Sequence, residues 1–211
     1  MDFTLNFTDA GTPFCLIAAL LFAKNYEQLS KVEKPIAIVI WLNLICDIVC
    51  FFLSEYEVET GLAYNFLLPI ERVISLFVYF TAVSQKSRIR WLFLFGMVSV
   101  VLIRIGSTIL ENPPTELQYA ANTLEGLMTA ILSYVFIRTI IAEKARVSLI
   151  LLAFGLANFF YLTLMATAMS ALPLAGSIDK AYANALYSIN TVAYIFWSII
   201  LITAILWKKR I

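Results

Sequence analysis

The sequence predicts an all-α polytopic membrane protein, a single bundle of seven transmembrane helices that takes in residues 1–211 as one domain. Hydrophobic residues make up 62% of the chain and charged residues 14%, whereas soluble domains are about half apolar and a quarter charged. The mean hydropathy of +0.88 points the same way. Apolar runs of about 20 residues, long enough to cross a bilayer, alternate with short polar segments that leave no room for an extramembrane domain.

The first three spans are bounded by breaks that can be read in the sequence. The span expected at 8–24 follows an acidic segment without the basic residues of a cleaved signal peptide, so we expect it to stay in the mature protein. The span expected at 35–53 opens on Pro35, a residue favoured in the first turn of a helix. That span ends at the charged "SEYEVET", and the span expected at 61–83 ends at the polar "QKSR".

The last four spans are expected at 89–110, 119–141, 146–169 and 182–207. The turn-rich "ENPPTE" follows the first of them, and "ALPLAGSIDK" precedes the last. Trp207 is expected at the headgroups, with the basic residues behind it acting as stop-transfer charge.

Basic residues predict the direction of the spans. Twelve of the fifteen lie in one set of connections, together with the C-terminus, and only Lys180 lies in the other set. The positive-inside rule therefore places the N-terminus outside and the C-terminus in the cytoplasm. The twelve are Lys24, Lys31, Lys34, Lys86, Arg88, Arg90, Arg138, Lys144, Arg146, Lys208, Lys209 and Arg210.

The composition also narrows the chemistry. The chain has no histidine, which removes the commonest metal ligand and neutral-pH acid–base group, and no phosphate-loop or nucleophile motif occurs. Cys46 and Cys50 lie one helical turn apart, as a metal or redox pair would, but we interpret them as apolar packing residues. We therefore expect no enzyme activity, no cofactor and no metal site, and the net charge of +1 gives no reason to expect nucleic acid.

Five ionisable residues lie well within the predicted spans, where each costs at least about 2.5 kcal/mol unless it faces a partner or a cavity. They are Asp47, Glu71, Arg72, Arg104 and Glu125. Consecutive residues on a helix point about 100° apart. We therefore expect one member of the Glu71–Arg72 pair to face a cavity and the other to pair across a helix seam. Arg104 is expected to pair with Asp47 or Glu71.

Uncharged polar residues extend these positions into stripes, because residues three or four apart share a helix face. The candidate ligand-binding residues are Asn43, Asp47, Glu71, Arg72, Arg104, Glu125, Asn158, Tyr161, Tyr187, Asn190 and Tyr194. The helical rise of about 1.5 Å per residue places them at the midplane or in the outer half, as in a pocket open to the outside. The competing interpretation is that the charges are ion pairs that only fix helix register. The amides and hydroxyls favour a pocket, because register pairs do not need them.

Two stretches of the chain repeat weakly. "NFLLPIERVISLFVYF" at 65–80 aligns with "NALYSINTVAYIFWSI" at 184–199 with five identities in sixteen positions, and "EKPIAIVIWLN" aligns with "EKARVSLILLA". These pairs suggest two parallel three-helix units joined by the fourth helix. That layout resembles the SWEET and PQ-loop transporters in helix count and topology, although their Pro-Gln motif is absent. "LLPIERVISLFVYF", "LANFFYLTLM" and "YSINTVAYIFW" look similar to segments of small seven-helix bacterial membrane proteins without an assigned activity, which implies a bacterial inner membrane.

The function that the sequence favours is transport of a small polar or zwitterionic solute by alternating access around this pocket. The alternative is a receptor that binds a ligand in the same pocket and signals through a separate partner protein. The expected partners are the lipid bilayer, a small polar ligand, and a signalling partner or a second copy of the chain. The five charges sum to −1, so the ligand should carry a positive or zwitterionic group. If one acid is protonated, a neutral, hydroxyl-rich ligand is expected instead.

Overall fold

The computed structural model describes residues 11–56, 61–108, 115–143, 148–178 and 180–208, and within these ranges it contains seven α-helices, one short 3-10 helix and no strand. The helices are α1 (Thr12–Lys24), η2 (Tyr26–Gln28), α2 (Lys34–Glu55), α3 (Gly61–Ala82), α4 (Arg90–Thr108), α5 (Thr115–Ala142), α6 (Leu149–Ile178) and α7 (Lys180–Lys208). An α-helix therefore lies at each of the seven predicted spans, and the all-α class is confirmed.

Five of these helices are long and apolar enough to cross a membrane: α2, α4, α5, α6 and α7. Large apolar side chains cover their outer surfaces, among them Phe95, which is 69% exposed, and Ile131, which is 62% exposed. A soluble monomer rarely exposes contiguous apolar surface of this extent. The chain therefore has the character of an integral membrane protein. α1 has only 13 residues, and α3 carries two charges at mid-length, so neither is among the five candidate spans. That the chain crosses the membrane seven times therefore stays a prediction.

Several boundaries differ from the sequence prediction, two of them by a helical turn or more. α6 does not end near residue 169 but continues to Ile178, through most of the segment expected to break it. Proline and glycine are tolerated in membrane helices because neighbouring groups satisfy the freed backbone atoms. α5 begins at Thr115, a turn earlier than expected. Residues 8–10, the expected start of the first span, lie outside the described ranges.

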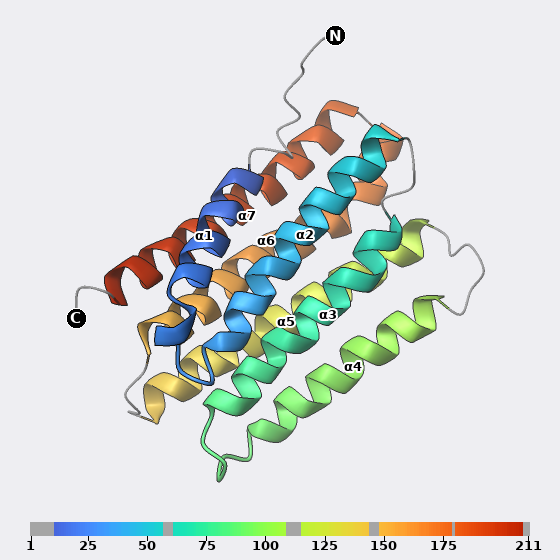
Figure 1. Cartoon of the computed structure of the whole chain (residues 1–211). Coiled ribbons are helices and arrows are strands. Elements are labelled where there is room, and N and C mark those ends of the chain that lie inside the picture. Colours follow the sequence, from blue (N-terminus) through green and yellow to red (C-terminus); the bar gives the residue numbers. More distant parts are fainter. Residues whose placement is uncertain (1–10, 57–60, 109–114, 144–147, 179, 209–211) are drawn as a thin grey trace.

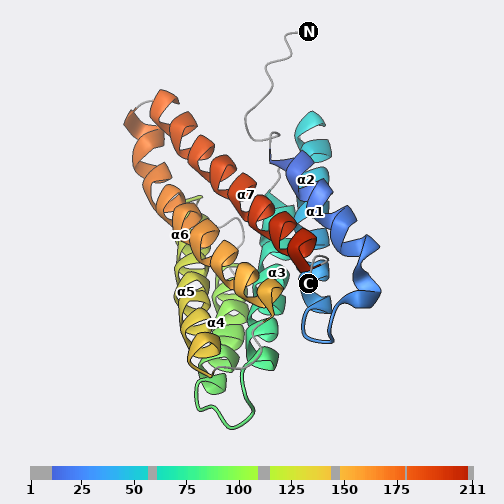
Figure 2. The same ribbon diagram turned by 90° about the vertical axis from the view of Figure 1, so that its left-hand side faces the viewer.

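The helices form a closed ring in chain order (Figures 1 and 2). Each helix packs against the next one in the sequence, and α7 returns to pack against α1. α3 also contacts α5 across the ring. Successive helices run in opposite directions, so α1, α3 and α5 end where α2, α4 and α6 begin, at one end of the bundle that is here called the basic end (Figure 1).

Small residues let the helices approach closely, as is common where lipid supplies no hydrophobic drive between helices. Gly126 on α5 faces α6, where an added Cβ would lie 3.2 Å from the Cβ of Ala166. Gly155 on α6 faces α5, where a Cβ would lie 3.0 Å from the ring of Phe136. At the start of α1, a Cβ on Gly11 would lie 2.6 Å from the ring of Tyr194 on α7.

Candidate functional site

A buried charge pair lies at mid-length on α3. Glu71 and Arg72 are 3% and 1% exposed, and the Arg72 guanidinium donates a hydrogen bond to the Glu71 carboxylate beside it. The hydroxyl of Ser75, one turn further on, donates to Glu71 Oε1 at 3.1 Å. Arg72 Nη2 also reaches Met165 Sδ on α6 at 3.5 Å. The expectation that the two residues point to different places is wrong, because the long arginine side chain folds back onto its neighbour.

A second buried pair joins α4 to α5. Arg104 Nη2 lies 2.9 Å from Glu125 Oε2, and Arg104 Nε lies 3.2 Å from Glu125 Oε1. Arg104 Nη2 also donates to Asn122 Oδ1 at 2.7 Å. The predicted partner of Arg104 is therefore corrected from Asp47 or Glu71 to Glu125. The reason is the ring order, in which α4 packs against α3 and α5, and Glu71 is already taken by Arg72.

A chain of hydrogen bonds connects α7, α6, α3 and α5 in that order, and each donor that links two helices points toward the next one. Trp197 Nε1 on α7 donates to Asn158 Oδ1 on α6 at 2.7 Å, and Asn158 Nδ2 donates to the hydroxyl of Tyr79 on α3 at 2.9 Å. The Tyr79 hydroxyl and Ser133 Oγ on α5 lie 2.8 Å apart, and Ser133 Oγ donates to the carbonyl of Thr129 at 2.7 Å. Because the serine proton is used there, Tyr79 must donate to Ser133. Each donor group in the chain then has an acceptor, as a buried network requires.

Two tyrosines connect α6 and α7 at the centre of the bundle. The rings of Tyr161 and Tyr194 lie 5.7 Å apart, and Tyr194 stacks on Trp197 at 5.8 Å. Arg72, Glu71 and Asp47 lie within electrostatic range of Tyr161. Tyr194 interacts with Asp47, Tyr161 and the thiol of Cys15. Polar groups from α1, α2, α3, α6 and α7 therefore converge on this aromatic group.

Two buried polar atoms of α7, Asn190 Oδ1 and Ser198 Oγ, have no hydrogen-bond partner among the described residues, and the Tyr194 hydroxyl between them lies against the Cys15 thiol. The three residues follow one another at intervals of four. Ser198 is fully buried and Tyr194 is 8% exposed. Buried polar groups almost always find a partner, and leaving one unpaired costs about 1–3 kcal/mol. This edge of α7, here called the α7 stripe, can therefore form hydrogen bonds to water or to a polar ligand.

The remaining predicted residues are placed differently. Asn43 is buried, but its amide nitrogen donates to the carbonyl of Val39 on its own helix at 3.0 Å. Asp47 accepts a hydrogen bond from Thr12 Oγ1 on α1 at 3.4 Å, so it links α2 to α1. The side chain of Tyr187 lies outside the described part of the chain.

One polar centre was missed by the sequence reasoning. Glu33, 1% exposed, accepts hydrogen bonds from the Ser30 amide and Lys208 Nζ, both at 2.7 Å, and from Ser148 Oγ. It thereby ties the α1–α2 connection to the start of α6 and the end of α7. The spacing Ser-x-x-Glu immediately before an apolar run is the capping-box pattern, and it would have located this residue.

Comparison with known protein families, curated proteins and solved structures found no match for this chain.

Proposed function

We propose that this chain is a membrane transporter for a small polar solute that carries an ammonium group, such as an amine or a zwitterion. The observation that supports it most is the α7 stripe, whose unpartnered oxygens lie on the helix that carries the aromatic group of Tyr161, Tyr194 and Trp197. These hydroxyl and amide oxygens would accept hydrogen bonds from a solute.

The charge near the stripe favours a positive group on the solute. Asp47, Glu71 and Arg72 all interact with Tyr161, and together they carry one more negative than positive charge. Aromatic faces attract ammonium groups through the ring quadrupole, which adds to the attraction of the acids. A solute that brings both an ammonium and a carboxylate could also engage Arg72.

The helix contacts support a two-unit transporter layout. In this layout α1, α2 and α3 correspond to α5, α6 and α7, in that order. The contact between α1 and α7 then corresponds to the contact between α5 and α3, and the structure has both. The contacts α1–α2 and α2–α3 likewise correspond to α5–α6 and α6–α7, and α4 is the helix without a counterpart. Parallel repeats place transporter sites at the interface between the units. In this proposal the chain has seven spans in a bacterial inner membrane, with the N-terminus outside, and resembles the SWEET and PQ-loop transporters in layout.

Uptake into sealed proteoliposomes tests the proposal. Radiolabelled amines, amino acids and sugars would be screened first, and the best solute then measured with Ser198→Ala and Tyr194→Phe. Loss of one hydrogen bond to the solute, worth about 1.4 kcal/mol, should weaken half-saturation about tenfold. Thr203→Ala is the matched control, because this exposed α7 hydroxyl bonds only to its own helix at Ile199.

Binding and uptake together separate the two functions that use such a pocket. A transporter gives time-dependent accumulation beyond the amount of bound solute. Saturable binding without accumulation would instead identify a ligand-sensing receptor that signals through a partner. Neither binding nor uptake of any charged or zwitterionic solute would contradict the proposal and leave the charges as register-fixing pairs.

A further inference from the structure

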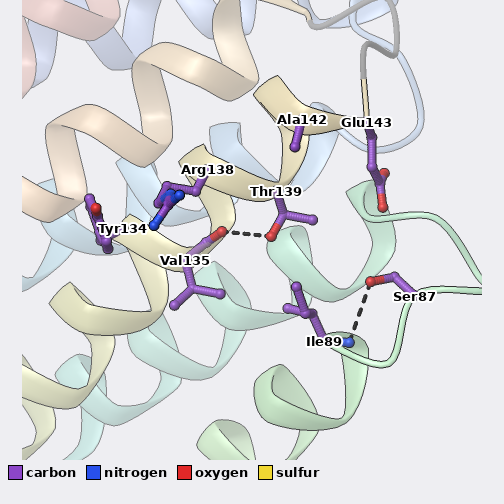
Figure 3. Close-up of a pocket in the computed structure, with 8 residues that line it drawn as sticks. All are labelled: Ser87, Ile89, Tyr134, Val135, Arg138, Thr139, Ala142 and Glu143. Carbon is purple, nitrogen blue, oxygen red and sulfur yellow. Dashed lines mark hydrogen bonds between the residues drawn. The ribbon is translucent and has the colours of Figure 1, made fainter.

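A pocket of about 510 Å³ opens at the basic end of the bundle, between the last turns of α5 and the α3–α4 connection (Figure 3). Its lining residues are Ser87, Ile89, Tyr134, Val135, Arg138, Thr139, Ala142 and Glu143. None of them belongs to the site in the bundle centre. The pocket is therefore separate from that site.

The lining combines one cation with one anion that do not pair. Figure 3 shows Arg138 beside Tyr134 on one side of the labelled group and Glu143 on the other. Among the described residues neither forms an ion pair, although Glu143 Oε2 accepts a hydrogen bond from the Ser84 amide at 3.2 Å. Glu143 directly follows Ala142, the last residue of α5, whereas Arg138 lies one turn inside that helix. A guest with both a negative and a positive group would satisfy both.

The position of the pocket matches the level of lipid headgroups. The apolar stretch of α5 ends at Ala142, and that of α4 begins at Arg90, so the lining residues lie where both helices leave the hydrocarbon. Two exposed aromatic residues lie near this boundary: Trp91, 72% exposed, is the second residue of α4, and Tyr134, 48% exposed, lines the pocket. Tryptophan and tyrosine are enriched at this boundary of membrane proteins.

An apolar surface leads from the pocket into the bilayer. One face of α5 carries a row of exposed side chains that runs toward the pocket at helical spacing. The row consists of Leu124, Leu127, Ile131 and Tyr134, followed by Arg138. The Arg138 guanidinium lies 6.0 Å from the centre of the Tyr134 ring, at the polar limit of this face. Acyl chains could lie along the row while a headgroup enters the pocket.

We propose that this pocket binds the headgroup of a zwitterionic phospholipid with a primary amine, phosphatidylethanolamine. The phosphate would lie against Arg138, which can donate several hydrogen bonds to phosphate oxygens. The ammonium would donate to Glu143 and to the hydroxyl of Ser87. A choline headgroup has no N–H to donate, and a glycerol headgroup leaves the Glu143 charge without a cation.

Lipid binding to the purified full-length protein tests this assignment. Native mass spectrometry and thermal melting would be run with phosphatidylethanolamine, phosphatidylcholine and phosphatidylglycerol of identical acyl chains. Phosphatidylethanolamine should be retained and should raise Tm most. Arg138→Gln and Glu143→Gln should each weaken its retention about tenfold, the loss of one charge-assisted contact. Arg88→Gln, an exposed basic residue of the same end outside the lining, should leave retention unchanged.

Removing Glu143 gives a second, qualitative readout. With only Arg138 left, Glu143→Gln should shift the preference from ethanolamine toward the anionic glycerol headgroup. Equal retention of all three lipids by the unmodified protein would overturn the proposal. So would equal stabilisation by soluble glycerophosphoethanolamine, because it would show that the occupant is a solute rather than a lipid. Both variants change exposed side chains, and their melting without lipid shows whether the fold is intact.

Discussion

Arg104 and Glu125 meet through two parallel hydrogen bonds, Nη2 to Oε2 at 2.9 Å and Nε to Oε1 at 3.2 Å, in a seam between α4 and α5 where both side chains are buried. Two-pronged pairing of this kind is the strongest geometry available to an arginine and a carboxylate. The candidate span of α4 is only 28% buried, less than those of α2, α5, α6 and α7, and this pair anchors it to α5.

Breaking that pair from one side should destabilise the bundle strongly. Arg104→Leu leaves the Glu125 carboxylate buried and unpaired, which costs about 3–5 kcal/mol. The double variant Arg104→Leu/Glu125→Leu should recover most of the loss, because no buried charge remains. Thermal unfolding in detergent measures both. An Arg104→Leu single variant that melts like the unmodified protein would contradict the pairing.

Tyr79→Phe should destabilise the centre of the bundle by about 1–3 kcal/mol, because it removes the acceptor of Asn158 and the donor to Ser133. The change keeps the ring that stacks on Phe136 at 4.3 Å, so packing is preserved. Tyr182→Phe removes a hydroxyl from an exposed tyrosine and serves as the control. Equal melting of the two variants would mean that the four-helix network contributes nothing measurable.

Glu33 should make stability depend on pH on the acid side. Burial raises the pKa of its carboxyl, but the hydrogen bonds from Lys208, Ser148 and Ser30 outweigh burial, so its pKa lies below the ordinary value of 4.5. A lowered folded-state pKa contributes stability above the unfolded value and loses it as the pH falls through the folded value.

Glu33→Gln should therefore lower Tm most above about pH 5, and the difference from the unmodified protein should shrink as the pH falls below about 4. Lys208→Gln should give a smaller effect of the same sign, because the lysine is 36% exposed and solvent screens its share. A difference that is constant over this range would show that the carboxylate gains nothing from its three donors.

Gly126 and Gly106 should respond oppositely to the same substitution. Gly126→Leu forces α5 away from Ala166 and Met165 on α6, and overpacking of this kind costs about 1–3 kcal/mol. Nothing lies within 4 Å of a Cβ built on Gly106, so Gly106→Leu should be neutral or gain up to about 1 kcal/mol of helix propensity. Melting of the two variants side by side measures the difference, and a similar loss in both would exclude close α5–α6 packing as the cause.

Apolar periodicity and turn signals were sufficient to place the seven helices. A helix that crosses a membrane needs about 20 apolar residues, and other structural elements rarely contain an apolar run of that length. They failed at the end of α6, where a proline and a glycine were read as a break although a helix can absorb both. Local sequence says little about such residues when neighbouring helices supply the missing partners.

The burial of the charged residues could be predicted, but their partners could not. Glu71, Arg72, Arg104 and Glu125 are all buried as expected, since an isolated charge is costly in lipid. Which arginine meets which acid depends on the ring order and on how far each side chain reaches, and neither is written in the spacing. Tyr79 escaped notice for a related reason, because a tyrosine in an apolar run reads as packing until its hydroxyl is seen among Ser133 and Asn158.

Thiol labelling at position 198 tests most directly whether a polar solute reaches the α7 stripe. The three native cysteines, Cys15, Cys46 and Cys50, would be replaced by alanine, and Ser198→Cys added in sealed vesicles. Ala204→Cys, in apolar packing on the same helix, serves as the unreactive control. Tyr56→Cys serves as the reactive control, because Tyr56 is 78% exposed and directly follows Glu55, the last residue of α2, which ends away from the basic end. A small, water-soluble thiosulfonate added from outside should label positions 198 and 56 but not 204. Labelling at 56 with none at 198 would contradict a solute site in the centre of the bundle.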